Sequence, residues 1–357
     1  MKKILVMIII ICSLLPINVW GIDVSSECFI LMEQNSGRVI AGKNIHRPKL
    51  IASVTKIMTA IIAIESKKLD KMVTVDKSVL KSYGTNIYIE LNEEILLRDL
   101  VYGLMLRSGN DAAMMIASYL AGSELEFAKL MNQKAKELGM VNTIFKNPHG
   151  LDEETENYST AYDIALLTRY AMQNNEYRKI VGTKKYIVKT NYKTYEWTNK
   201  NKLLFNYKYT TGGKNGYTEK ANRTLVTTAS KDKLDLIVVT LNDNNQWNNH
   251  QILHEYGFNN YKNYKILSKK HFKVVDDYFY QDKLYIKNDF YYPLRKEEKD
   301  LVTTKAKIVK LDGYRHNDVV GAIEVYLKDE LIHSQDIYVS KPSKKISFWR
   351  KLFAWLD

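Results

Sequence analysis

The sequence predicts two folded parts, an α/β domain over residues 24 to about 262 and a small all-β domain over residues 265–340. The chain has 357 residues, which is enough for two hydrophobic cores. Helical and strand-like hydrophobic patterns are mixed up to about residue 260. The residues that follow contain only short runs rich in Tyr, Val and Ile between turn signals.

The elements of the first part follow from hydrophobic periodicity and turn residues. Apolar runs on both sides of Asn35-Ser36-Gly37 predict a β-hairpin. Residues 53–66 are rich in Ala, Ile and Met and lack Gly and Pro, which predicts a buried helix. Further helices are expected at 97–106, 111–121, 125–138 (closed by Gly139) and 160–172, and strands at 185–190, 224–230 and 234–241.

The character of the sequence changes around Tyr256-Gly257-Phe258. Short runs of alternating apolar and polar residues follow, among them residues 306–311 and 319–327. Such runs, separated by turn residues, are typical of strands in a small all-β domain.

Residues 1–21 have the pattern of a secretory signal peptide. Lys2-Lys3 precede an apolar run from Ile4 to Leu15, and cleavage is expected after Gly21. The run is shorter than the roughly 20 apolar residues that span a bilayer, although an uncleaved N-terminal anchor is the alternative. Export would leave Cys28 as the one cysteine of the mature protein, and its apolar neighbours predict a buried structural role.

The last residues, 341–357, have the pattern of an amphipathic helix. At 100° per residue the cations Arg350 and Lys351 fall on one side. The opposite side collects Ile346, Phe348, Trp349, Leu352, Phe353, Trp355 and Leu356. Aromatic residues opposite cations indicate a helix that lies in a membrane interface. A helix docked on the β domain is the alternative.

The net charge is +13, from 53 basic and 40 acidic residues. Nucleic acid is one partner of such a basic chain, but export argues against it. The basic residues are mostly scattered lysines, so we interpret them as solvated surface. Anionic lipids and cell-wall polymers are the polyanions that an exported bacterial protein would meet.

Three short motifs carry chemistry. The first is Ser53-Val54-Thr55-Lys56, at the start of the apolar helix; the same spacing recurs at Ser78–Lys81 and Ser230–Lys233, but neither opens an apolar helix. A serine hydroxyl needs a nearby base before it is a good nucleophile. A lysine can be that base only if burial or a second cation lowers its pKa from about 10.4. The apolar helix offers the burial.

The other two motifs are less specific when taken singly. Ser108-Gly109-Asn110 lies between two expected helices, where Ser and Asn are also ordinary helix caps. Lys214-Asn215-Gly216-Tyr217-Thr218 follows two glycines and could be a plain turn into a strand. In this order, however, the three motifs resemble the SxxK, SxN and KTG signature of penicillin-binding proteins and serine β-lactamases.

Longer strings resemble one branch, the low-molecular-mass D-alanyl-D-alanine carboxypeptidases. The resemblance covers nearly the whole mature chain and is most specific in the middle motifs and least specific in the β domain. The strings are Ile51–Thr59, Met105–Ala113, Asn147–Asp152, Ser159–Asp163 and Gly213–Ala221. The resemblance implies the penicillin-recognising serine hydrolase fold, an antiparallel sheet with helices, followed by an all-β stalk.

The resemblance also implies roles for individual residues. Ser53 would be the acylated nucleophile, Lys56 its general base and Ser108 a proton relay to the leaving amine. Asn110 would bind the substrate amide, and Lys214 would lower the pKa of Lys56 and attract the terminal carboxylate. The substrate contacts of the third motif would extend over Asn215, Gly216, Tyr217 and Thr218, with the backbone N–H groups of Ser53 and Tyr217 as an oxyanion hole.

The implied partners are peptidoglycan stem peptides, β-lactam antibiotics as covalent inhibitors and the outer face of the cytoplasmic membrane. No metal or organic cofactor and no nucleic acid is expected. One residue departs from the family pattern, because Asn215 stands where the family usually has Thr. Two alternatives therefore stay open: a weakly active or inactive peptidoglycan-binding homologue, and a serine β-lactamase, although no separate deacylating glutamate motif follows Ser108.

Three histidines are further candidate functional residues. His250 and His254 have the i, i+4 spacing of metal ligands, but no acidic partner is apparent, so a solvent-facing helix is expected there. His149 is expected to pack or cap a loop near the active site.

Overall fold

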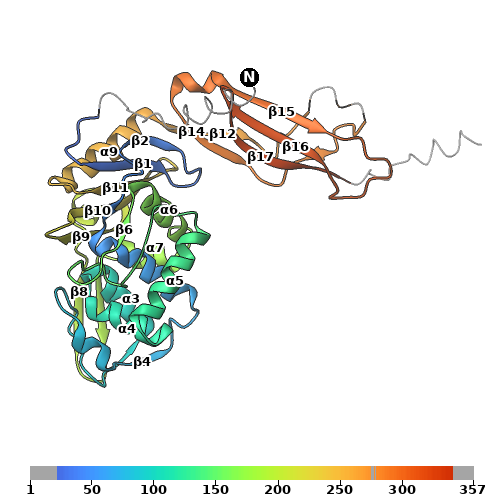
Figure 1. Cartoon of the computed structure of the whole chain (residues 1–357). Helices are drawn as coiled ribbons and strands as arrows, with labels where there is room; N and C mark the ends of the chain where they lie inside the picture. Colours follow the sequence, from blue (N-terminus) through green and yellow to red (C-terminus); the bar gives the residue numbers. More distant parts are fainter. Residues whose placement is uncertain (1–21, 275–276, 278, 341–357) are drawn as a thin grey trace, which may run out of the picture. The chain divides into compact units, whose positions relative to one another are not determined.

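The computed structural model describes residues 22–274, 277 and 279–340. The expected signal peptide and the expected C-terminal helix both lie outside these residues. The chain forms two compact units, the first of which ends at Asn259 and the second of which begins at Asn260 (Figure 1). Within the described residues, no helix has the length and apolar composition that crossing a bilayer requires.

A five-stranded antiparallel sheet organises the first unit. Its order is β2 (Val39–Lys43), β1 (Cys28–Glu33), β11 (Leu234–Leu241), β10 (Asn222–Lys231) and β9 (Thr210–Thr218). The predicted hairpin of β1 and β2 and the strand at 234–241 are confirmed. Asp232 and Lys233, both with positive φ, close the two-residue turn between β10 and β11. The SxxK spacing at Ser230–Lys233 therefore includes the end of β10 and this hairpin turn.

The helices of the first unit are α2 (Lys56–Glu65), α3 (Leu97–Tyr102), α4 (Asn110–Ala121), α5 (Glu124–Glu137), α6 (Ala161–Ala171), α7 (Asn175–Gly182), α8 (Leu203–Asn206) and α9 (Gln246–Asn260). A 3₁₀ turn, η1 (Ala52–Thr55), precedes α2, and a π turn, η3 (Gly103–Arg107), follows α3. The helices predicted at 53–66, 97–106, 111–121, 125–138 and 160–172 are all present. The structure differs from the prediction locally, because η1 forms the start of the first of these segments and η3 the end of the second.

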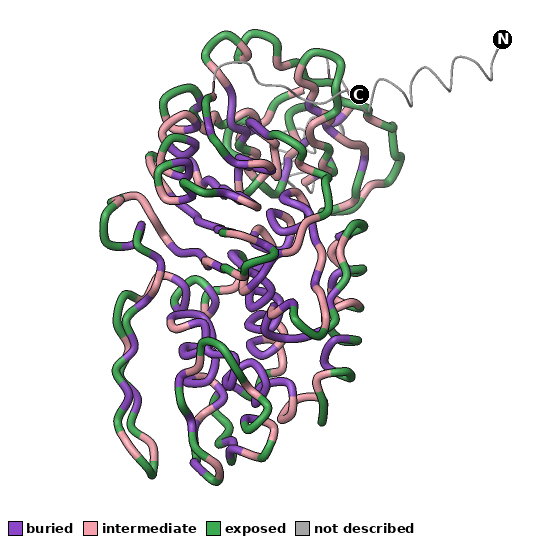
Figure 2. The backbone as a smooth tube through the Cα atoms, turned by 60° about the vertical axis from the view of Figure 1, so that its left-hand side comes forward, coloured by how far each residue is buried: buried purple, intermediate pink, exposed green. Residues whose placement is uncertain are grey.

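Small two-stranded pieces complete this unit: β3 (Lys49–Leu50) with β6 (Tyr158–Ser159), β4 (Met72–Thr74) with β5 (Glu94–Leu96), and β7 (Lys185–Lys189) with β8 (Thr194–Thr198). The 3₁₀ turn η2 (Lys77–Lys81) contains the remaining SxxK spacing, and the Asp76 side chain caps it. In Figure 2 the buried segments lie in the interior of this unit and the exposed ones in its outer loops.

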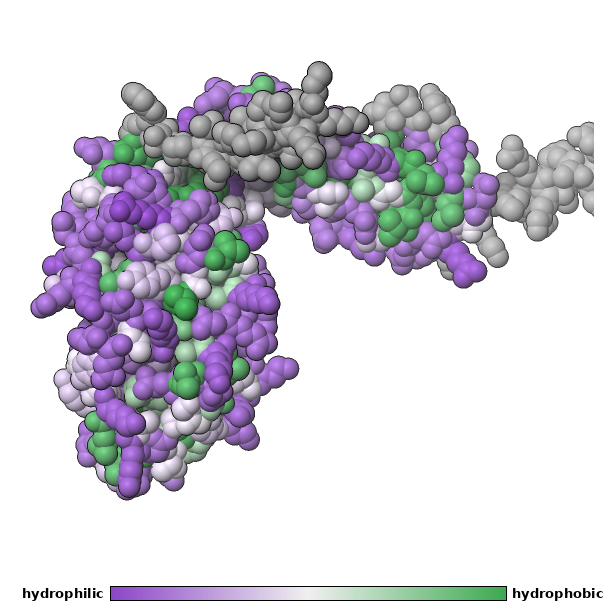
Figure 3. Space-filling model, viewed as in Figure 1, coloured by the Kyte–Doolittle hydropathy of each residue, from purple (hydrophilic) through white to green (hydrophobic). Residues whose placement is uncertain are grey.

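The two faces of the sheet have different partners. Ile237, Val239 and Leu241 of β11 belong to the main core together with the helices, among which α2 is almost entirely buried. The alternate residues of β11 face α9. The contact is close, because a Cβ atom added to Gly257 of α9 would lie 2.5 Å from the Leu236 side chain. Cys28 is fully buried in β1, as predicted. The face shown in Figure 3 is mostly hydrophilic with scattered apolar residues.

The expectation that His250 and His254 face solvent is wrong. Both side chains are fully buried between α9 and the sheet. Thr227 Oγ1 lies 2.7 Å from His250 Nδ1 and 2.8 Å from His254 Nε2, and Thr240 Oγ1 lies 3.0 Å from His250 Nε2. The strands supply hydroxyl partners, which the spacing along the helix could not reveal.

The second unit has a core of its own, built from Leu267, Tyr280, Leu284, Ile286, Val320, Ile323, Val325, Ile337 and Val339. One sheet has the order β13 (Leu284–Tyr285), β17 (Glu330–Val339), β16 (Val319–Leu327), β15 (Val302–Ile308), and β12 (Lys262–Leu267) pairs with β14 (Phe290–Leu294). A 3₁₀ turn, η4 (Lys296–Leu301), precedes β15. The strand predicted at 319–327 is confirmed, whereas the one predicted at 306–311 begins at Val302 and ends at Ile308.

Candidate active site

Ser53 lies on the turn η1, directly before α2. Side chains at i and i+3 eclipse each other in a 3₁₀ turn. As a result, Lys56 Nζ lies 3.0 Å from Ser53 Oγ. The turn begins at Ala52, whose φ of 46° is unusual for a residue with a Cβ. The first motif thus forms the serine–lysine pair that its spacing predicted.

Lys56 is completely buried and its amine is surrounded by acceptors. Nζ lies 2.7 Å from Asn110 Oδ1, at the start of α4, and 2.5 Å from the backbone oxygen of His149. The Asn110 amide nitrogen donates in turn to the backbone oxygen of Tyr83 at 2.7 Å. The amine is therefore held from three sides by different segments of the chain.

Ser108 and Lys214 form a second pair. Ser108 ends η3 with a φ of 66°, and this left-handed elbow directs the chain into α4. Lys214, on the edge strand β9, is 1% exposed and its Nζ lies 3.0 Å from Ser108 Oγ. The ammonium also donates to the backbone oxygen of Asn215 at 2.6 Å.

The strand β9 packs closely against the serine turn. A Cβ at Gly216 would lie 2.7 Å from Ser53 N and 2.6 Å from Thr224 Oγ1. Only glycine fits such a contact, because real Cβ atoms essentially never come so near to another heavy atom. Gly216 therefore allows the outer edge of β9 to lie beside Ser53.

The two lysines have strongly lowered pKa values. Burial is the main cause for both. Burial, followed by the charges of Lys214 and Lys200, moves the pKa of Lys56 well below its usual value, against the opposing effect of Asp111. Burial and then Lys200 lower the pKa of Lys214 to about 7. Lys56 therefore loses its proton more readily than an ordinary lysine does.

Several residues that hold this site together could not be assigned from the sequence. Asn157 Nδ2 donates to Thr55 Oγ1 at 3.0 Å and to the backbone oxygen of Asn147, so it ties the serine turn to the 147–152 loop. A Cβ at Gly150, which has a φ of 87°, would lie 1.9 Å from the backbone oxygen of Ala52. The resembled string Asn147–Asp152 was the available signal, but its contacts were not predictable.

Two family models match the chain. One described as D-alanyl-D-alanine carboxypeptidase matches residues 17–245, which is more than half of the chain. The chain belongs to the D-alanyl-D-alanine carboxypeptidase family. A model described as the C-terminal domain of penicillin-binding protein 5 matches residues 261–345.

Individual relatives agree with the family assignment. D-alanyl-D-alanine carboxypeptidase DacF of Bacillus subtilis is 37% identical over 216 residues, which are 59% of this chain and 55% of that protein. DacA of Haemophilus influenzae is 26% identical over 360 residues, 94% of this chain and 89% of that protein. The crystal structure of penicillin binding protein 5 from Haemophilus influenzae has a TM-score of 0.75 at 25% identity, over 90% of this chain and 98% of that one. The chain thus spans only about half the length of the Bacillus subtilis relative.

The remaining residues of the predicted site differ in their surroundings. Asn215 is half-buried, and its side chain has no hydrogen-bond partner among the described residues. Tyr217 is exposed, with the Arg223 guanidinium 5.3 Å from its ring centroid. The Thr218 hydroxyl is already engaged, because it donates to Asp152 Oδ2 and accepts from Ala221 N. Thr218 thus connects strand β9 to the loop at Asp152.

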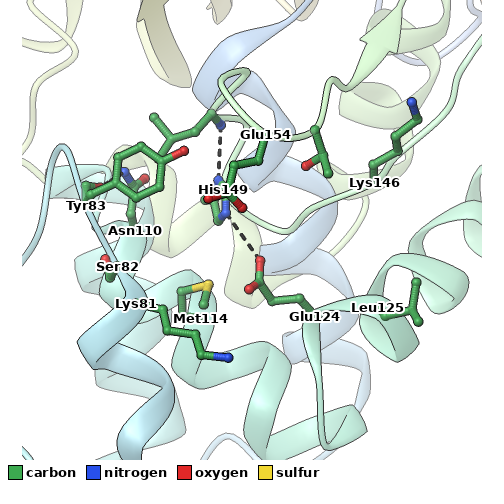
Figure 4. Close-up of a pocket in the computed structure, with 12 residues that line it drawn as sticks. Lys81, Ser82, Tyr83, Asn110, Met114, Glu124, Leu125, Lys146, His149 and Glu154 are labelled. Atoms are coloured by element: carbon green, nitrogen blue, oxygen red, sulfur yellow. Dashed lines mark hydrogen bonds and ion pairs between the residues drawn. The ribbon is translucent and has the colours of Figure 1, made fainter.

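His149 caps a loop beside the site, as predicted. Its Nδ1 accepts from the Leu151 N–H at 3.1 Å, so the ring proton is on Nε2, which lies 3.3 Å from Glu124 Oε2 (Figure 4). Burial lowers the pKa of His149, against the opposing effect of Glu124. No group of three or more His, Cys, Asp or Glu side chains that could hold a metal is found in the described part of the chain.

Proposed function

We propose that the chain is a serine-type D-alanyl-D-alanine carboxypeptidase, which removes the terminal D-alanine from peptidoglycan pentapeptides through an acyl-Ser53 intermediate. One observation carries the proposal, the environment of the Lys56 amine. A neutral amine has two N–H donors and one lone pair. The Asn110 and His149 oxygens accept the two donors, so the lone pair is left for the Ser53 hydroxyl at 3.0 Å. This is the arrangement that a general base requires.

In the first half of the reaction, Ser53 Oγ attacks the carbonyl carbon of the penultimate D-alanine and Lys56 takes the hydroxyl proton. The backbone N–H groups of Ser53 and Tyr217 bind the oxyanion, an interaction that typically contributes about 3–4 kcal/mol. The peptide C–N bond then breaks, and a proton passes through Ser108 to the leaving amine of the terminal D-alanine. The close approach of Gly216 to Ser53 N supports this use of the β9 edge.

In the second half, water attacks the acyl carbon and releases the shortened peptide, which restores the Ser53 hydroxyl. Lys214 attracts the terminal carboxylate and Asn110 binds the substrate amide. β-Lactams would acylate Ser53 in the same manner. The half-buried amide of Asn215, which has no hydrogen-bond partner in the described part of the chain, keeps one alternative open, a weakly active or inactive homologue that binds peptidoglycan.

We also propose an extracytoplasmic location. Residues 1–21 would direct export, residues 24–262 would form the catalytic domain and residues 265–340 a stalk. Residues 341–357 would anchor the protein on the outer face of the cytoplasmic membrane. Support comes from the sequence pattern of the two terminal segments.

Labelling with penicillin tests the proposed nucleophile. Ser53→Ala should lose both covalent labelling and D-alanine release, because the variant lacks the hydroxyl that lies 3.0 Å from the buried Lys56 amine and that is proposed to be acylated. The matched variants Ser78→Ala and Ser230→Ala carry the same motif spacing and should keep both activities. A Ser53→Ala protein that still bound penicillin covalently would refute the assignment. Rapid release of the drug by the wild type would instead favour the β-lactamase alternative.

A further inference from the structure

The second unit has exposed apolar side chains at one end of its larger sheet. Val309, Leu311 and Val319 are 69%, 41% and 52% exposed, and they lie where β15 ends and β16 begins. Figure 3, in the view of Figure 1, shows apolar side chains gathered at the end of this unit to which the β15 arrow points. Single exposed apolar residues are common on soluble proteins, but a group on one short segment indicates a contact surface.

The backbone of this segment, residues 309–319, is held in place from inside the unit. The hydroxyl of Tyr280, a fully buried residue, donates to Val309 O at 2.6 Å and accepts from Leu311 N at 2.8 Å. Val309 N donates to Val320 O at 2.8 Å, which continues the pairing of β15 with β16. The exposure of Val309 and Leu311 is therefore a property of a hydrogen-bonded backbone.

The described chain leaves the second unit at the same end of the sheet. Asn317 N donates to Val339 O at 2.9 Å and Val339 N donates to Asp318 O at 3.1 Å, so the segment lies beside the end of β17. Ser340 follows directly. Ile346, the first apolar residue of the proposed anchor, is six residues further along the chain, which extends over at most about 20 Å. An anchor in a membrane interface therefore brings this end of the unit close to the lipid.

We propose that the 309–319 segment is a second membrane contact, which buries Val309 and Leu311 in the lipid interface beside the anchor. The inference rests on the proposed membrane location of residues 341–357. Exposure alone would not select this end, because Leu301 and Leu331 are exposed to a similar extent at the opposite end of the sheet. The position at which the chain leaves the unit makes the distinction.

The charges of the segment separate its role from that of the anchor. Lys310 and Arg315 balance Asp312 and Asp318, so the segment has no formal net charge. It binds lipid by apolar burial, whereas the cations of residues 341–357 add attraction to anionic lipid. So few apolar side chains do not hold a protein on a bilayer alone. The segment strengthens the binding of the anchor and restricts the tilt of this unit, which a single point of attachment leaves free.

Pelleting of the full chain with phospholipid vesicles tests the contact. Val309→Ser/Leu311→Ser should raise the lipid concentration that binds half of the protein by about fivefold, because apolar burial in the interface is lost. Leu301→Ser/Leu331→Ser is the matched control at the opposite end, where the leucines are 42% and 51% exposed, and it should bind as the wild type does. Equal binding by the two double variants would overturn the proposal.

Two other occupants of this apolar surface would give different results. If residues 341–357 docked on it as a helix, Val309→Ser/Leu311→Ser would free that helix, and vesicle binding would become stronger. If a second copy of the chain occupied it, sedimentation without vesicles would show a dimer that the same variant loses. Either result would overturn the lipid contact.

Amide hydrogen exchange of the wild type gives a measurement that needs no variant. On vesicles, exchange in residues 309–319 should slow, and exchange in the Lys328-Asp329 turn between β16 and β17 should not change. Unchanged exchange in both places, in a protein that pellets, would refute the second contact and leave the anchor intact. A wild type that did not pellet would refute the anchor and the second contact together. Neither measurement depends on D-alanine release, so the proposed reaction is tested separately.

Discussion

At the residue scale, Lys56 shows how function opposes stability. An amine with no exposed surface is disfavoured in its charged form, and the nearby charges of Lys214 and Lys200 act in the same direction. The unfolded chain would hold the Lys56 proton up to about pH 10.4. Folding therefore favours loss of this proton at pH values below 10.4, which costs stability that is regained as the pH rises towards the unfolded value. In the proposed mechanism, this cost keeps a base available beside Ser53.

Acylation should consequently rise with pH through a lysine titration that lies well below the reference value. Lys200 contacts neither the serine nor its base in the described hydrogen bonds, yet its charge lowers the pKa of both Lys56 and Lys214. Lys200→Gln should therefore shift the midpoint of the acylation profile to higher pH. The second-order rate of penicillin labelling between pH 5 and 10 measures this shift. Lys202→Gln, exposed on the same segment, should leave the midpoint in place, and an unchanged midpoint in Lys200→Gln would contradict the electrostatic account.

Asn215 gives a second prediction at this scale. If its amide binds the substrate carboxylate less well than the usual hydroxyl, Asn215→Thr should raise kcat/KM for a D-alanyl-D-alanine peptide about tenfold, or ~1.4 kcal/mol. Penicillin labelling and peptide hydrolysis should be measured in parallel. A lower kcat/KM in the Thr variant would mean that this chain has adapted its site to the amide.

At the scale of single elements, hydrophobic patterns predicted the helices and strands whose positions depend on burial alone. The strand Leu234–Leu241 and the buried helix after Ser53 followed from runs of apolar residues. The π turn before Ser108 and the left-handed Ala52 did not, because tertiary contacts impose them. The site motifs were found by their spacing, whereas the roles of Asn157, Gly150 and Lys200 depend on contacts between distant segments. The burial of His250 and His254 on α9 was not predicted for the same reason.

The buried histidines of α9 should make the fold sensitive to acid. Burial lowers the pKa of His254 to about 3 and that of His250 well below its usual value. In the unfolded chain both would titrate near pH 6.5. Below that pH the unfolded state binds more protons, so the free energy of unfolding should fall by about 1.4 kcal/mol per pH unit for each histidine. For His254 this fall would continue to about pH 3.

Urea unfolding at pH 7.5, 6.5, 5.5 and 4.5 measures the effect. The double variant His250→Gln/His254→Gln should show a flatter dependence below pH 6.5, even if it is less stable at pH 7.5. His46→Gln, at an exposed histidine of the same unit, should keep the wild-type slope. An unchanged slope in the double variant would show that other groups determine the acid response.

At the scale of the whole molecule, two units with separate cores agree with the two family matches at 17–245 and 261–345. The shift to short alternating runs was sufficient to predict the β part, because its strands expose one side and bury the other. It could not fix strand ends, as β15 shows: most of its residues are exposed, so the burial pattern is weak there. Residues 341–357, which lie outside the described part, remain a prediction from sequence alone.

Truncation after Ser340 tests the proposed anchor. Burial of the apolar side of an interfacial helix and attraction of cations to anionic lipid both favour membrane binding, the latter by about 1 kcal/mol for each basic residue. The five cations removed are Lys341, Lys344, Lys345, Arg350 and Lys351. The truncated protein should stay in the supernatant when anionic vesicles are pelleted and should still hydrolyse a small D-alanyl-D-alanine peptide, because every proposed site residue lies before Ser340.

Trp349→Asp/Phe353→Asp should also release the full chain, whereas high salt should release only part of it, since salt screens charge but not apolar burial. A truncated protein that still pelleted with membranes would make the N-terminal segment the anchor, and the signal peptide would then remain uncleaved.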